Sequence, residues 1–227
     1  MKIKNLVMIL ALAAVTVGCA DKPKQETKKE VKETNYSELT KQYAKVKLTS
    51  DISHLSDNEK QMLNYLYEVG NIMDDIFWTQ QFGGDKETFL NSIQDPDARL
   101  FAEINYGPWN HFDGLAPFLP DYGEMPAGAG FYPADMTKEE FEAWDNPDKT
   151  SLYTLVRRDE KGNLQSVWYH DAYAEQIQKA AKLLEEASKL AGDKEFADYL
   201  SLRAKALLSD DYFESDMAWM DVRNNNV

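Results

Sequence analysis

Residues 56–77, SDNEKQMLNYLYEVGNIMDDIF, indicate which class of fold this chain adopts. Ser56 and Glu59 have the spacing of a capping box, in which two side chains satisfy backbone amides at the start of a helix. Apolar residues then recur at alternating intervals of four and three, at Met62, Leu66, Val69, Met73 and Ile76. This spacing places them on one face of an α-helix. The stretch therefore predicts a helix that starts at Ser56 and ends before Gly83-Gly84.

Start and stop signals predict further helices along the chain. Asp85, Asp95-Pro96, Thr137 with Glu140, and Asp193 are typical of helix starts, and Gly192 is typical of a stop. Further helices are expected with inward faces at Phe89, Leu90 and Ile93; at Leu100, Phe101 and Ile104; at Tyr173, Ile177, Ala180, Leu184 and Ala187; at Phe196, Tyr199, Leu200, Ala206 and Leu207; and over residues 210–220. Runs at residues 152–156 and 167–169 favour strands, and Gly162-Asn163 marks the turn of a hairpin between them.

Between Asn105 and Pro133 the composition changes. This stretch holds five of the chain's 11 glycines and five of its 8 prolines, so it cannot form a continuous helix or a central strand. We therefore expect a mainly α fold with one small β-hairpin and one long ordered loop rich in Gly, Pro and aromatic residues.

The charge balance argues against one class of partner. Acidic residues outnumber basic ones 39 to 25, which gives a net charge of −14. A surface of this sign repels phosphate backbones, so no nucleic-acid partner is expected. With 43% hydrophobic residues in 227, the chain is long enough for one domain with a real core.

The first 50 residues have the features of an export and anchoring region. Residues 1–18 combine a basic start with an apolar stretch and small residues, which is typical of a secretory signal. Cys19, the chain's one cysteine, stands where a bacterial lipoprotein signal carries its lipidated residue; an ordinary signal with an incidental cysteine is the alternative. Residues 19–50 are then expected to be the lipidated cysteine and a flexible charged tether, and residues 51–227 the folded part. This predicts a bacterial cell-envelope protein, periplasmic or surface-exposed, attached to the membrane through its N-terminal lipid.

The motifs of known catalytic sites are absent from the sequence. His54, His111 and His170 are scattered, and none begins the pair of histidines around a glutamate that zinc hydrolases use. There is no G-x-S-x-G elbow, and residues 128–130 lack the strand and lysine of a phosphate-binding loop. The acidic pairs at 74–75 and 210–211 are expected to be solvated or capping groups. No catalytic residue, metal site or cofactor is therefore assigned to this chain.

One run has the composition of a cleft wall. Residues 103–119, EINYGPWNHFDGLAPFL, combine flat aromatic faces with hydrogen-bonding groups, which suits ligand contact. It equally suits a long loop that aromatic side chains fix to a helical body. The candidate contact residues are Asn105, Tyr106, Trp109, Asn110, Phe112 and Asp113.

Four segments together resemble a known family. They are residues 103–119, GAGFYPADMTKEEFEAW (128–144), SLYTLVRRDEKGNL (151–164) and LSLRAKALLSDDYFESDMAWMDV (200–222). In this order they are similar to the N-terminal half of bacterial proteins of the dipeptidyl-peptidase III family. These are two-lobed zinc-dependent exopeptidases that release dipeptides from peptide N-termini, and many are lipoproteins. The resemblance covers roughly residues 55–227.

The resemblance implies that this chain is one part of a longer enzyme. The family's His-Glu zinc motif and its peptide-binding segment have no counterpart here, so zinc and peptide substrates are expected only for a full-length form. The chain is then expected to be the helical N-terminal lobe, incomplete at its C-terminus and inactive alone, with the missing C-terminal lobe as a partner. An apolar patch around Met217, Trp219 and Met220 would be exposed where that lobe docks. The alternative is a stand-alone surface lipoprotein that binds peptides or another ligand without catalysis.

Overall fold

Helix α2 (Asp57–Phe82) begins and ends where the sequence predicts, in a computed structural model that describes residues 34–227. The Ser56 hydroxyl accepts a hydrogen bond from the Glu59 amide at 3.2 Å, and the Glu59 carboxylate accepts one from the Ser56 amide at 2.8 Å. The helix stops at Gly83, whose φ of 75° lies in the left-handed region that favours glycine. The signal peptide expected over residues 1–18 and the lipidation at Cys19 lie outside the described residues.

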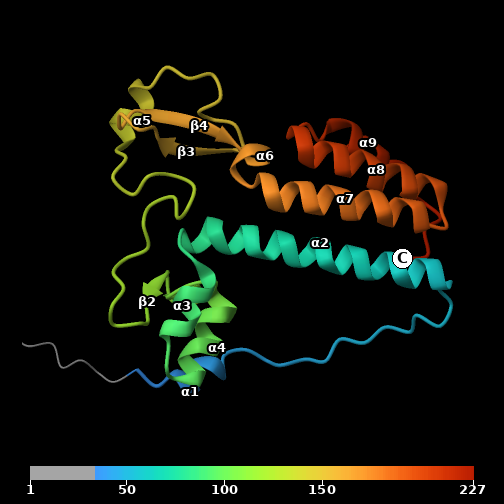
Figure 1. Cartoon of the computed structure of the whole chain (residues 1–227). Coiled ribbons are helices and arrows are strands. Elements are labelled where there is room, and N and C mark those ends of the chain that lie inside the picture. Colours follow the sequence, from blue (N-terminus) through green and yellow to red (C-terminus); the bar gives the residue numbers. More distant parts are fainter. Residues whose placement is uncertain (1–33) are drawn as a thin grey trace, which may run out of the picture. The chain divides into compact units, whose positions relative to one another are not determined.

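The main core lies between three helices. α7 (Ala174–Leu190) packs against both α2 and α8 (Lys194–Ser209), and α9 (Phe213–Asp221) packs on α8 (Figure 1). The expected face of α7 is confirmed, because its five predicted residues are all buried. Alanines at the contacts allow the helices to approach closely, and the core also takes Leu155 from the hairpin. Its buried members include Met62, Ile72, Ile76, Ile177, Ala180, Leu184, Ala187, Phe196, Leu200, Ala204 and Leu207.

A second apolar cluster, the aromatic cluster, forms at the other end of α2. Trp78 there packs with residues of α3 (Lys86–Ser92), α4 (Pro96–Asn105) and the loop that follows. Asp85 and Asp95 cap α3 and α4 as predicted. Leu100 was expected to face inward but is exposed, because α4 buries Ala98, Phe101 and Ala102 instead. The buried members of the cluster are Trp78, Phe89, Leu90, Phe101, Ala102 and Phe118.

The structure differs from the expectation of a flexible tether up to residue 50. Residues 36–40 form α1 (Tyr36–Thr40), which packs against α4. Tyr36 donates a hydrogen bond to the Phe118 carbonyl at 3.3 Å, and Tyr43 donates one to Asn105 Oδ1 at 3.3 Å. The physical reason is that Tyr36, Leu39 and Tyr43 supply apolar surface to the aromatic cluster, which offsets the entropy lost on ordering.

The predicted hairpin is present with shifted ends. β3 (Thr154–Arg158) pairs antiparallel with β4 (Leu164–Trp168), so that Leu155 faces Val167 across the ladder. α6 (Tyr169–Ala172) follows β4 directly. Upstream, α5 (Lys138–Ala143) starts at Thr137 as predicted, and its Glu140 binds Arg158 of β3 at 2.9 Å.

Between α4 and α5, the long loop contains β1 (Trp109–Asn110) and β2 (Ala116–Pro117), a two-residue antiparallel pair. Gly130 fixes its far end. The Gly130 amide donates to the Gln80 carbonyl at 2.8 Å. A Cβ at this position would overlap the Thr79 carbonyl oxygen and lie 2.9 Å from that of Gln80. The loop therefore approaches the last turn of α2 as closely as two backbones can.

The fold class is thus confirmed as mainly α with a small hairpin and a long ordered loop, and the loop adds the two-residue strand pair of β1 and β2. Among the described residues, no helix is both long enough and apolar enough to span a bilayer.

Candidate functional site

The candidate loop begins at a polar hub formed by Asn105 at the end of α4. This side chain is buried; its Nδ2 donates to the Phe101 carbonyl at 2.9 Å. Its Oδ1 accepts from the His111 amide at 3.0 Å and from the Tyr43 hydroxyl. Asn105 thus ties together the end of its own helix, the tip of the loop and the segment after α1. With both of its side-chain polar atoms engaged inside the protein, it acts as a structural group.

Tyr106 follows in the left-handed conformation, with φ of 53°, and turns the chain out of α4. Its hydroxyl donates to Asp74 Oδ1 at 2.6 Å, and its ring meets that of Phe77 edge-on at 4.7 Å. The hydrogen bond to the Asp74 carboxylate, together with burial, raises the pKa of Tyr106 to about 12. Asp74 and its neighbour Asp75 also bind Lys86, at 3.4 and 2.7 Å. This acidic pair is therefore engaged in structural contacts.

Trp109 and Asn110, which form β1, are both buried. Trp109 Nε1 donates to the Gly123 carbonyl at 3.0 Å, and this bond joins the two halves of the loop. Asn110 Oδ1 accepts from the Phe112 amide at 2.9 Å and stabilises the turn at the loop tip. Neither side chain faces solvent, so in this structure both hold the loop in shape.

Phe112 and Asp113 lie in the turn between β1 and β2 and are both exposed. Phe112 is 70% exposed, and its ring lies 5.2 Å from that of Tyr43. Asp113 is exposed beside it. The structure thus divides the six sequence candidates: four fix the loop, and Phe112 and Asp113 remain exposed.

The three histidines do not converge. His54 and His111 are exposed, on different segments, and His170 lies on α6. Within residues 34–227, no three His, Cys, Asp or Glu side chains are grouped so as to hold a metal ion. The donor set described here therefore does not fit zinc.

Sequence reasoning missed a buried pair at the end of α8. Asp210, expected to be solvated or capping, has a fully buried side chain and a φ of 56°. Its Oδ2 lies 2.7 Å from His170 Nδ1 and accepts from the His170 amide at 3.1 Å. The pair therefore fastens α6 to the C-terminus of α8. No local pattern could reveal it, because 40 residues separate the partners.

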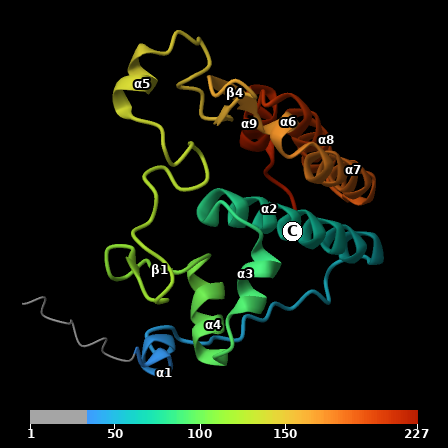
Figure 2. The same cartoon turned by 60° about the vertical axis from the view of Figure 1, so that its left-hand side comes forward.

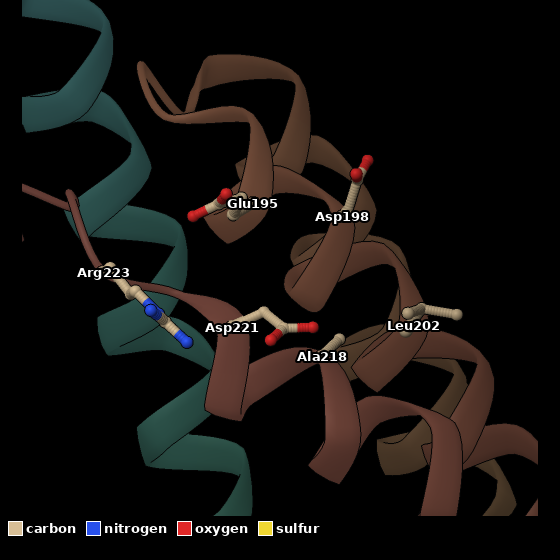
Figure 3. A pocket seen from close by; sticks show the side chains of 6 residues that line it. All are labelled: Glu195, Asp198, Leu202, Ala218, Asp221 and Arg223. Atoms are coloured by element: carbon tan, nitrogen blue, oxygen red, sulfur yellow. The ribbon is translucent and has the colours of Figure 1, made fainter.

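Two hollows lie beside α8. One, of about 470 Å³, is rimmed by charged side chains of α8, α9 and the segment that follows (Figure 3). The carboxylates of Glu195 and Asp198 point apart in this view, and Asp198 also binds Lys194, which argues against a shared ion. The lining residues are Glu195, Asp198, Leu202, Ala218, Asp221 and Arg223.

The other hollow, of about 580 Å³, is mostly apolar and opens between α2, α7 and α8. Leu66, Val69 and Met73 of the predicted α2 stripe line one wall, and Phe196, Tyr199 and Leu207 line another. Nearby, α9 exposes Phe213, Met217 and Met220 at helical spacing, and Trp219 is also more than half exposed. The apolar patch expected around Met217, Trp219 and Met220 is therefore present on the surface.

Comparisons with known proteins match this fold to longer proteins. The structure of dipeptidyl-peptidase III from Caldithrix abyssi is similar with a TM-score of 0.76 and 35% identity, over 81% of this chain and 37% of that one. Dipeptidyl-peptidase III from Corallococcus sp. strain EGB is similar with a TM-score of 0.76 and 30% identity, over 83% of this chain and 37% of that one. The resemblance predicted from the sequence is thus confirmed.

Among curated sequences, Nudix hydrolase 3 of Arabidopsis thaliana is 24% identical over 254 aligned positions, which span 85% of this chain and 33% of that protein. No family model matches the chain. The chain therefore spans about a third of each of these proteins, from 33% to 37% of their length. This extent is consistent with the N-terminal part of a dipeptidyl-peptidase III-like protein.

Proposed function

We propose that this chain is the non-catalytic N-terminal lobe of a dipeptidyl-peptidase III-like zinc peptidase, which in its longer form releases dipeptides from peptide N-termini. The observation that supports this most is the 35% identity and TM-score of 0.76 to the Caldithrix abyssi enzyme over four fifths of the chain. An identity at this level, over this length, is more than a shared helical architecture would supply.

The chemistry of the described residues supports a non-catalytic role. One histidine is engaged with Asp210, and the other two are exposed and apart. A catalytic zinc needs three converging ligands and an open position for water. In the proposal, zinc and the groups that activate water come from the part of the longer protein that this chain does not match. No step of the reaction is assigned to a residue described here.

In the longer protein, this lobe would contribute surfaces that contact the remaining lobe and the peptide. In the proposal, the remaining lobe covers the apolar hollow beside α8 and the apolar residues of α9, since exposed patches of this kind mark interaction sites. Phe112 and Asp113, at the tip of the long loop, would then be the groups of this lobe nearest to bound peptide. Cys19 would carry the lipid that holds the protein at the bacterial cell envelope.

A chimera tests the proposal. The part of the Caldithrix abyssi enzyme that matches this chain is replaced by this chain, and zinc content and released dipeptides are measured by mass spectrometry. We expect the chimera to bind one zinc ion and to release dipeptides, and the chain alone to do neither. A folded, zinc-loaded chimera without activity contradicts the proposal, as does a chain that alone retains zinc and trims peptides.

The same chimera tests whether the loop tip contacts bound peptide. Phe112→Ser and Asp113→Ala should raise KM for peptides without loss of zinc. Leu152→Ser is a matched control, because Leu152 is 82% exposed on a different segment. An unchanged KM in both loop variants would remove this loop from the peptide-binding surface. A stand-alone binding lipoprotein, the alternative, requires instead that the chain alone binds peptides in calorimetry and stays monomeric.

A further inference from the structure

Residues 44–52, AKVKLTSDI, have the side-chain pattern of a β-strand but lie outside every helix and strand of the described chain. The even-numbered positions carry Ala, Val, Leu, Ser and Ile, and the odd-numbered ones carry Lys, Lys, Thr and Asp. Alternation over this length, interrupted on the apolar face by Ser50, is typical of a strand with one apolar face. Here that face has no cover: Val46 is 70% exposed and Leu48 is 90% exposed.

The backbone of this stretch is also free to pair. Within residues 34–227, the amides and carbonyls of residues 44–51 make no backbone hydrogen bond. Figures 1 and 2 both show the stretch as an extended trace that joins α1 to α2. An extended backbone with unpaired amides and carbonyls is a template for another strand.

Both ends of the stretch are fixed. Tyr43 binds Asn105, and its ring packs edge-on against Phe101 at 5.9 Å. At the other end Leu55 is buried, and Ser56 takes part in the capping box of α2. A segment held at both ends loses less conformational entropy when it pairs than a free peptide does.

The local charge indicates the kind of partner. Residues 44–52 contain two lysines, Lys45 and Lys47, and one aspartate, Asp51, in a chain whose net charge is −14. Opposite charges on facing strand positions stabilise a pair, and like charges destabilise it. The same stretch of a second copy would place its own lysines against Lys45 and Lys47, so it is a poor match. A strand with carboxylates at alternate positions suits Lys45 and Lys47.

We propose that residues 44–52 are an interaction site that receives an extended, acidic segment of a partner polypeptide as an added β-strand. The backbones supply the hydrogen bonds, the partner's apolar side chains cover Val46 and Leu48, and its carboxylates face Lys45 and Lys47. The site is independent of the peptidase proposal, since it uses none of the surfaces assigned there.

The test is amide hydrogen exchange on the full chain, kept in detergent micelles, with and without a synthetic peptide of sequence EVEVEVE. We expect amides within residues 45–51 to exchange about tenfold more slowly when the peptide is present. The peptide EEEEVVV has the same composition without alternation, so it separates strand pairing from general charge attraction. KVKVKVK reverses the charge.

Two variants locate the pairing edge. Lys47→Pro and Leu48→Pro each remove one amide, and neighbouring amides of a strand point to opposite edges. At least one variant should abolish the protection, whereas Leu48→Ala, which keeps its amide, should retain most of it. Melting temperatures should be unchanged in all three, which shows that they remain folded. The proposal is overturned by equal protection from EEEEVVV or KVKVKVK, by no protection, or by protection that rises with protein concentration alone, which would indicate a second copy.

Discussion

The two apolar regions of this molecule are built in different ways. The core between α2, α7 and α8 is made mainly from aliphatic and alanine side chains that recur at helical spacing on each helix. The aromatic cluster at the far end of α2 is made mainly from Trp, Phe and Tyr side chains that come from four helices and the segments that follow them. The first region depends on repetition along the sequence, and the second on contacts between distant segments. A mutation in the first region should therefore disturb the packing of helical faces, and a mutation in the second should disturb contacts between distant segments.

The largest effect is expected at the centre of the aromatic cluster. Phe101 is fully buried, and its ring meets those of Phe118 at 4.7 Å and Tyr43 at 5.9 Å. Phe101→Ala leaves a large cavity and should lower the free energy of unfolding by about 3–5 kcal/mol, measured by urea denaturation. Leu184→Ala, in the helical core, should cost about 2–5 kcal/mol. If one variant produces a second, separate transition, the two regions unfold independently and the chain is not one cooperative unit.

The next effect tests how the long loop is joined to α2. Gly130→Ala forces a methyl group against the Thr79 and Gln80 carbonyls, and should cost about 1–3 kcal/mol through strain and a weakened hydrogen bond. Gly70→Ala is the control, because nothing lies within 4 Å of its added Cβ in the middle of α2. That variant should gain up to about 1 kcal/mol from helix propensity. Equal melting temperatures for the two variants would contradict the close approach.

A smaller effect is expected where the hairpin side of the molecule joins α8. Asp210→Asn keeps a residue that tolerates the left-handed conformation, but it removes the charge beside His170. The charge-assisted hydrogen bond should weaken, which lowers the free energy of unfolding by about 1–2 kcal/mol. Asp211→Asn, at the exposed neighbour, should have little effect. Similar losses in both variants would show that the loss does not come from the buried pair.

How much of this could be predicted differs between the two regions for a physical reason. The α7 face from Tyr173 to Ala187 follows from helical periodicity, which is a local property of the sequence. The docking of α1 cannot be predicted from local periodicity, because Tyr36 and Tyr43 bind partners that lie 82 and 62 residues away in the sequence. In the candidate site, composition identified a set of polar and aromatic residues. It could not separate the anchors Asn105 and Trp109 from the exposed Phe112, because that depends on the direction in which the folded loop turns.

The smallest effect concerns the hydrogen bond that Tyr106, beside the aromatic cluster, donates to Asp74 of α2. This bond raises the pKa of Tyr106 to about 12, so its contribution is fully present below the ordinary tyrosine pKa near 10 and is lost as pH rises towards 12. Tyr106→Phe should therefore cost on the order of 1 kcal/mol at pH 8 and less at pH 11, measured by urea denaturation at both values. Tyr67→Phe, at an exposed tyrosine of α2, should leave both values unchanged. A loss for Tyr106→Phe that does not shrink as pH rises would assign the stability to ring packing on Phe77, and the hydrogen bond to Asp74 would then contribute little.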